Sequence, residues 1–305
     1  MDTYALLIAS TMNAGTILAL ASLGLLINEK AGIVNLGAEG IMLCSAIAGF
    51  AAVVHSGSDA MGFLGGMGAG ALMAMLLGLL VIWLNTNQYA TGLALSLFGI
   101  GFSAFVGTGY VQAKLPTRLR FEVPFLADLP FVGTAFFKQH PIVYFSIVLT
   151  AALIYLFYKT KAGLILRAVG ESPESAHALG YPVRRIRLLA VMIGGALCGM
   201  AGAYVSIVYT PLWAEGMIAG KGWIALALTT FATWRPGRVL LGAYLFSGIT
   251  MLQFHLQAKG VDVPSQFLSM LPYISTIMVL ALISKNPRWL KVNMPASLGK
   301  PFFPG

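Results

Sequence analysis

Nine stretches along the chain consist almost entirely of apolar residues and are separated by shorter polar segments. A helix needs about 20 such residues to cross roughly 30 Å of bilayer hydrocarbon. The pattern predicts an all-α protein, a polytopic transmembrane helical bundle that forms a single domain over residues 1–305. The predicted spans are residues 5–26, 37–54, 61–84, 89–109, 142–158, 188–210, 221–234, 238–254 and 267–284. Because 221–234 is short and 27–36 fits a longer or broken second span, counts from eight to ten agree with the pattern.

Two hydrophilic segments interrupt these runs, and their charges predict how the chain is oriented. Residues 159–187 are rich in Lys and Arg, whereas residues 110–140 contain three prolines, at positions 116, 124 and 130. Lys and Arg collect on the cytoplasmic side of membrane proteins. We therefore expect 159–187 to be an inner loop and 110–140 an outer segment. Alternation of the spans then places the N-terminus outside and the C-terminus inside.

The composition supports a lipid environment. Hydrophobic residues make up 58% of the chain and charged residues only 10%, against roughly 25% charged residues in a soluble domain. The net charge of +9 does not indicate nucleic-acid binding, because the basic residues stand between apolar runs instead of forming one basic stripe with aromatics. Cys44 and Cys198 lie inside apolar runs and are expected to be small packing residues.

The inner loop contains the signals of a short helix. Ser172 suits the N-cap position and Pro173 the first helical position. Glu174 complements the positive end of the helix dipole, and Gly180 suits a left-handed C-terminal cap. The sequence thus predicts a helix over 173–179, about two turns long. Such a helix is too short to be stable alone, so we expect it to dock on a cytosolic partner, unless it is an ordinary surface turn of a long loop.

This helix resembles the coupling helix of ABC importer permeases, which docks on the ATP-hydrolysing subunit. The residues that carry the resemblance or adjoin it are Gly170, Glu171, Ser172, Pro173, Ala176 and Gly180. Segment 30–40 (KAGIVNLGAEG) resembles the start of the second span in the branched-chain amino acid and simple-sugar permease superfamily. Segments 87–94 (NQYATGLA), 220–227 (GKGWIALA) and 260–266 (GVDVPSQ) are similar to its nucleoside branch. The departure is Lys221, where relatives often carry Arg.

The resemblance implies a permease subunit in a bacterial cytoplasmic membrane that imports nucleosides or related purine or simple-sugar solutes. It also implies three kinds of partner: a separate ABC ATPase subunit, a second permease subunit, and an extracytoplasmic solute-binding protein or lipoprotein. The chain has no G-x-x-x-x-G-K-[ST] phosphate loop. We therefore expect it to be no enzyme and to bind no cofactor or metal, with ATP and Mg²⁺ held by the ATPase.

Four polar residues are candidates for the substrate pathway. Asn35 and Glu39 are four residues apart and share a helix face, and glycines at 32, 37 and 40 indicate an unwound or closely packed connection. Glu39 either lines the pathway or fixes a helix end, or it sits at the inner interface, paired with Lys30 or capping a neighbouring helix. Asn87 and Gln88 either contact a solute through their amides or cap a helix.

Glu215 and Lys221 form the last candidate pair, in a glycine-rich outer segment. They are expected to act as a gate or to form an ordinary interfacial ion pair.

Three rival functions stay open. A branched-chain amino acid permease would need a matched cation and anion near the membrane midplane. An ion-coupled secondary transporter would need charged residues at mid-span, and the runs 142–158, 188–210 and 267–284 contain no Asp, Glu, Lys or Arg. A membrane-embedded enzyme would need a catalytic constellation, and no G-x-S-x-G or H-E-x-x-H motif is present.

Overall fold

The computed structural model describes residues 2–115, 131–260, 263–284 and 293–303. Residues 116–130 of the predicted outer segment, including Pro116, Pro124 and Pro130, lie outside the described residues, as do Val261 and Asp262 of the 260–266 motif.

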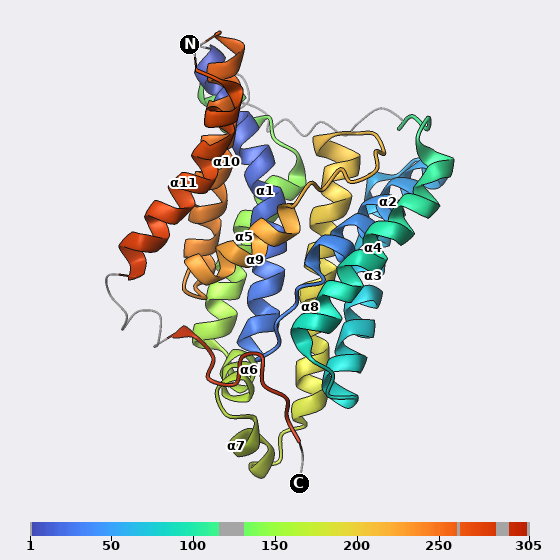
Figure 1. The fold of residues 1–305 in the computed structure, drawn as a ribbon, viewed down its shortest axis with the longest axis vertical. Coiled ribbons are helices and arrows are strands. Elements are labelled where there is room, and N and C mark those ends of the chain that lie inside the picture. Colours follow the sequence, from blue (N-terminus) through green and yellow to red (C-terminus); the bar gives the residue numbers. More distant parts are fainter. Residues whose placement is uncertain (1, 116–130, 261–262, 285–292, 304–305) are drawn as a thin grey trace.

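The described chain is built from helices joined by short connections (Figure 1). The α-helices are α1 (Asp2–Lys30), α2 (Ala38–Ser56), α3 (Asp59–Gly78), α4 (Gln88–Gly107), α5 (Pro141–Lys159), α6 (Lys161–Glu171), α7 (Pro173–Ala178), α8 (Val183–Tyr204), α9 (Lys221–Phe231), α10 (Pro236–Ala258) and α11 (Ser265–Ser284). Short π or 3₁₀ segments extend or connect them: η1 (Leu79–Trp83), η2 (Thr108–Tyr110), η3 (Gly133–Phe137) and η4 (Val205–Tyr209).

The core of the bundle is formed by α8 packed against α1, α2 and α3. Small residues allow this close packing. A Cβ atom at Gly70 of α3 would overlap the carbonyl oxygen of Gly195 on α8 and lie 2.8 Å from the Cα of Gly199. Such contacts are typical of membrane helices, whose association depends on close backbone approach instead of a hydrophobic driving force.

The two ends of the chain lie at opposite ends of the long axis (Figure 1). The N-terminus is at one end, and α6, α7 and the C-terminal residues are at the other. The predicted orientation requires this arrangement, with the basic loop 159–187 and the C-terminus on one side.

Among the described residues, the structure contains fewer spans than the nine or so that the hydropathy pattern predicts. In the part of the chain that the structure describes, seven helices are long and apolar enough to cross a membrane. They are Thr3–Lys30, Ala38–Ser56, Asp59–Trp83, Gln88–Tyr110, Pro141–Lys159, Val183–Tyr209 and Pro236–Ala258. The predicted span 267–284 corresponds to α11, which contains Pro272 and is not among the seven.

The predicted span 221–234 is instead the short helix α9, which lies about half-way along the bundle (Figure 1). Its 11 residues reach only about 16 Å at 1.5 Å per residue. The helix ends where Thr233 and Trp234 adopt positive φ angles of 51° and 53°. The indole N–H of Trp234 donates a hydrogen bond to the buried carboxylate of Glu29 on α1. The helix thus ends three residues before the predicted end of the span, and the tertiary contact between Trp234 and Glu29 holds the turn that follows it.

Candidate functional site

The chain is not helical between α1 and α2, over residues 31–37. Gly32 has a φ of +87°, a left-handed conformation that glycine adopts without steric cost. The buried Asn35 accepts a 2.9 Å hydrogen bond on its Oδ1 from the N–H of Gly37, which closes a local turn. The structure thus contains the unwound connection that the glycines predicted, and we call residues 31–37 the broken segment.

Helix α4 holds the broken segment in place. Gln88 is buried, and its Oε1 accepts a 2.8 Å hydrogen bond from the N–H of Val34. The hydroxyl of Ser96, two turns further along α4, donates a 2.8 Å hydrogen bond to the carbonyl of Leu36. These bonds satisfy backbone groups that the missing helical turns leave without intrahelical partners. Gln88 therefore braces the backbone of this segment through its carbonyl oxygen.

Asn87 has a different environment from its neighbour Gln88. Its side chain is exposed, and its Oδ1 accepts 3.0 Å hydrogen bonds from the N–H groups of Tyr89 and Ala90. This is the geometry of an N-cap. Of the two interpretations of Asn87, the structure supports helix capping.

Glu39 joins the start of α2 to the start of α9. Its Oε1 accepts a 2.8 Å hydrogen bond from the N–H of Gly220, and its Oε2 accepts a 2.7 Å bond from the N–H of Gly222. The side chain is only 6% exposed. A carboxylate at this position satisfies two free N–H groups and complements the positive end of the helix dipole. Of the interpretations of Glu39, the structure supports the one in which it fixes the end of a neighbouring helix, and among the described contacts Lys30 bonds to the carbonyl of Asn293 and not to Glu39.

Lys221 and Glu215 do not form the predicted ion pair. The ammonium of Lys221 donates a 3.0 Å hydrogen bond to the carbonyl of Ile218, whereas Glu215 is exposed. Burial lowers the pKa of Lys221 below its ordinary value, and the nearby carboxylate of Glu39 partly opposes this shift. Lys221 is thus a poorly solvated cation. The carboxylate near it, that of Glu39, caps the N-terminus of α9, the helix that Lys221 begins.

Lys221 lies on the wall of a cavity of about 430 Å³ between α1, η4, α9, α10 and α11. This volume is within the range of about 300–1,000 Å³ that is usual for small-molecule sites. Phe246 contributes an aromatic ring, and none of the described lining residues carries a carboxylate. The polar lining side chains are Tyr209, Lys221, Ser247, Thr250, Gln253, Ser269 and Tyr273.

Of these residues, the sequence singled out only Lys221, as part of a gate or ion pair. The predicted pathway residues, Asn35, Glu39, Asn87 and Gln88, are not on the cavity wall. A signal was nevertheless present. Ser247, Thr250 and Gln253 recur at every third residue of an apolar helix, so they share one helix face. Polar residues on one face of an apolar span point to a pathway or a cavity.

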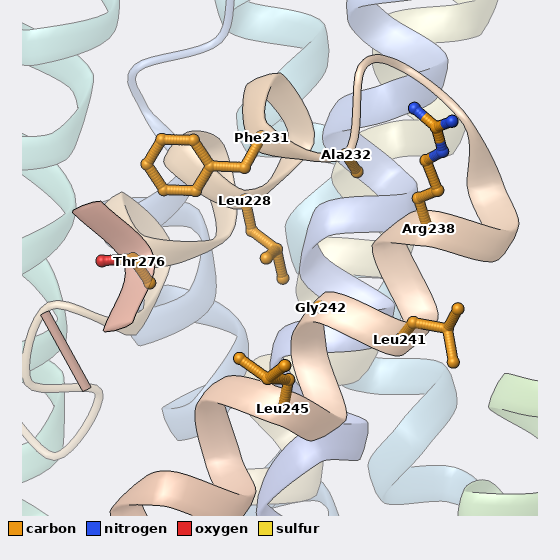
Figure 2. A pocket seen from close by; sticks show the side chains of 8 residues that line it. All are labelled: Leu228, Phe231, Ala232, Arg238, Leu241, Gly242, Leu245 and Thr276. Carbon is orange, nitrogen blue, oxygen red and sulfur yellow. The ribbon is translucent and has the colours of Figure 1, made fainter. Parts of the chain in front are cut away.

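A second cavity of about 230 Å³ opens between α9, α10 and α11 (Figure 2). Its wall is almost entirely apolar, with Leu228, Leu241 and Leu245 around it, and Arg238 is its one charged described residue. Few polar groups converge there, which makes it a poor site for a hydrogen-bonding solute.

The short helix α7 forms where the inner loop predicted it. The Ser172 hydroxyl oxygen accepts a 3.3 Å hydrogen bond from the N–H of Ser175, and Pro173 occupies the first turn. Gly180 has a φ of +87°, and the N–H of Tyr181 donates a 3.1 Å hydrogen bond to Ala176. These bonds define both ends of the helix. Its role in coupling stays a prediction.

Gly170 and Glu171 end the preceding helix, α6. A Cβ at Gly170 would overlap the carbonyl oxygen of Lys30 at the end of α1, so only glycine allows this approach. Glu171 accepts a long hydrogen bond of 3.4 Å from the N–H of Ala296. The end of α6, which leads directly into α7, is therefore in contact with the end of α1 and with the C-terminal residues.

Residues 7–283 match the family model described as branched-chain amino acid transport system / permease component. The chain belongs to this family. It is therefore a permease component, a transport subunit with several membrane-spanning helices. No solved structure matches the sequence significantly.

Three curated relatives are similar over nearly their whole length. A putative glucose ABC transporter permease of Haloferax volcanii is 38% identical over 98% of this chain and 97% of the relative. A nucleoside ABC transporter permease of Lactococcus lactis is 33% identical over 92% of this chain and 93% of the relative. A guanosine ABC transporter permease of Bacillus subtilis is 30% identical over 92% of both chains.

Proposed function

We propose that this chain is the permease subunit of an ATP-driven importer for nucleosides or related sugar-containing solutes. The 430 Å³ cavity is the solute site, and α7 receives the motion of a separate ATPase subunit. The observation that carries the proposal is the cavity wall, which combines hydroxyls, an amide and aromatic rings with a single cation.

These groups suit a neutral, hydroxylated solute. The Gln253 amide can donate to and accept from a nucleobase edge, and the hydroxyls of Thr250 and Tyr209 can do both toward a sugar ring. The rings of Phe246 and Tyr273, with centroids 6.0 Å apart, offer apolar surface for a base. The glucose, nucleoside and guanosine permeases among the relatives fit the same class of solute.

A zwitterionic amino acid suits this wall less well. Its ammonium group needs an anionic partner in a dry site, and the described lining residues include Lys221 but no carboxylate. Glu39, the nearest described anion to Lys221, already accepts bonds from Gly220 and Gly222. The amino acid alternative thus lacks the matched pair of charges that it requires.

An ion-coupled secondary transporter is disfavoured by membership in the permease family. Transport is instead by alternating access, in which ATP closes a pair of ATPase subunits and α7 passes their movement to the spans. ATP and Mg²⁺ bind to those subunits, and this chain supplies the pathway. A second permease subunit and an extracytoplasmic binding protein complete the importer, in the cytoplasmic membrane of a bacterium.

Co-purification followed by a transport assay tests the proposal. A tagged chain expressed in its native organism should co-purify with an ATPase. Vesicles that contain the purified complex should take up radiolabelled guanosine or adenosine in an ATP-dependent manner. Radiolabelled glucose and leucine are assayed in the same way. Uptake of glucose alone would assign the site to sugars, and uptake of leucine without nucleoside uptake would refute the proposal.

A matched pair of variants connects the cavity to the solute. Gln253 is 7% exposed and lines the cavity, whereas Gln257 lies one turn further along α10 and does not line it. Gln253→Leu should raise the KM for uptake about tenfold, because one buried hydrogen-bond partner is worth about 1–2 kcal/mol. Gln257→Leu should leave KM unchanged. Equal effects of both variants would contradict this location of the site.

A further inference from the structure

The C-terminal segment, residues 293–303, folds back onto the end of the bundle that carries α7 (Figure 1). Two hydrogen bonds attach it to the junction of α1 and the broken segment. The ammonium of Lys30 donates to the carbonyl of Asn293 at 2.9 Å, and the N–H of Gly299 donates to the carbonyl of Gly32 at 3.1 Å.

Ser297 connects this segment to two more helices. Its N–H and its hydroxyl both donate to the carbonyl of Gly170 at the end of α6, at 3.1 and 2.6 Å. The guanidinium of Arg187, in the first turns of α8, donates to the Ser297 oxygen at 2.9 Å. Ser297 and Arg187 are 6% and 2% exposed. A buried hydroxyl that donates one hydrogen bond and accepts another holds its partners in one geometry.

Phe302 attaches the other end of the segment to α7 itself. Its side chain is buried with Val169, Ala176 and Val183, and its ring meets His177 of α7 edge-on with centroids 5.6 Å apart. The adjacent Phe303 is 66% exposed. The C-terminal segment thus contacts α7 at one point and the broken segment at another.

We propose that residues 293–303 act as a strut that transmits displacement of α7 to the broken segment. The proposal rests on the coupling role of α7 given above. A push on α7 moves Phe302, and the bonds of Ser297 to Gly170 and of Gly299 to Gly32 carry the motion to the start of the broken segment. Coupling between distant sites travels through such contiguous packed and hydrogen-bonded contacts. Phe302 and Ser297 are therefore positioning residues for transport.

Two variants, at separate points of the strut, test the proposal in the complete importer reconstituted in vesicles. Phe302→Ala removes the contact with α7, and Ser297→Ala removes the hydroxyl between Gly170 and Arg187. Phe303→Ala deletes a neighbouring ring that is exposed to solvent, and it is the matched control. Solute uptake, ATP hydrolysis and the melting temperature are measured for each.

Both strut variants should hydrolyse ATP at nearly the normal rate but move roughly fivefold fewer solute molecules per ATP, a typical size for lost coupling. Phe303→Ala should keep the normal ratio. A purely structural role would lower uptake and ATP hydrolysis in proportion. An unchanged ratio of solute uptake to ATP hydrolysis in both variants, whether or not the two rates fall, would overturn the strut. If Phe302→Ala does not fold, Ser297→Ala alone decides.

The same experiment separates the two proposals. A wild-type complex that couples ATP to uptake, together with strut variants that couple equally well, refutes the strut and leaves the proposed function intact. A wild-type chain that retains no ATPase refutes the proposed function, and the strut falls with it.

Discussion

Glu39 on α2 accepts a 2.7 Å hydrogen bond from the backbone N–H of Gly222 on α9, a residue 183 positions away in the sequence. The second carboxylate oxygen accepts from Gly220, so one side chain fixes the start of α9. This start also carries Lys221, which lines the cavity. The bond between Glu39 and Gly222 therefore determines where the only cation of the described cavity wall is held.

Glu39→Gln is expected to destabilise the protein and to impair uptake. An amide has only one oxygen acceptor, so one buried N–H loses its partner, at a cost of about 1–3 kcal/mol. The negative charge at the helix N-terminus is lost as well. Thermal unfolding of the purified chain in detergent measures the effect. Glu215→Gln, which changes an exposed carboxylate, should leave the melting temperature unchanged, and similar melting of both variants would rule out the capping role.

Local signals explain why some of the fold could be predicted. Helix α7 begins and ends within one residue of the expected positions, because Ser172, Pro173 and Gly180 act on the backbone beside them. The seven long spans were recognised because lipid requires long apolar helices with internally satisfied backbones. The glycines at 32 and 37 correctly indicated the broken segment.

Long-range contacts explain what could not be predicted. The turn that follows α9 is held by a hydrogen bond between Glu29 and Trp234, which are 205 residues apart. The role of Glu39 depends on where the backbone of Gly220 is held in space. The cavity combines residues of five separate elements, and hydropathy contains no information about which of them face one another.

Lys221→Met should weaken solute recognition without unfolding the protein. Lys221 lines the cavity, and its ammonium donates to the carbonyl of Ile218, so the substitution removes a donor and a positive charge from the cavity wall. Removing one charged hydrogen-bond donor costs about 1.5–3 kcal/mol, and KM should therefore rise at least tenfold. Uptake kinetics in vesicles measure KM, and the melting temperature should stay within a few degrees of the wild-type value.

The same lysine predicts a pH dependence. Because burial lowers the pKa of Lys221, the ammonium loses its proton at a lower pH than an exposed lysine does. The charged form therefore declines as the pH is raised, and it does so at a lower pH than for an exposed lysine, so KM should rise toward alkaline pH. Lys221→Arg keeps its charge throughout and should lack this rise. Identical pH profiles of both proteins would show that Lys221 does not titrate in the site.

Gly180→Val should uncouple ATP hydrolysis from uptake. Gly180 has a φ of +87°, and a β-branched residue in this left-handed conformation costs about 1–2 kcal/mol. A Cβ there would meet nothing within 4 Å, so the effect is conformational and not a steric clash. Uptake per ATP should fall while the ATPase stays bound. Gly180→Asn, which tolerates the left-handed region, should retain most coupling, and equal loss in both variants would point to a different cause.

Gly70→Leu is expected to prevent correct packing of α3 against α8. Even the first side-chain atom would overlap the carbonyl of Gly195 and approach the Cα of Gly199 to 2.8 Å, so the two helices would have to separate along the core of the bundle. Overpacking of a well-filled core typically costs about 1–3 kcal/mol and more where backbone must move. Gly68 lies on the same helix, and a Cβ there would meet nothing within 4 Å. Gly68→Leu therefore matches the change in size and helix propensity without the clash. The yield of monodisperse protein in detergent and its melting temperature should fall for Gly70→Leu alone, and a comparable loss in Gly68→Leu would mean that this glycine contact does not determine the packing.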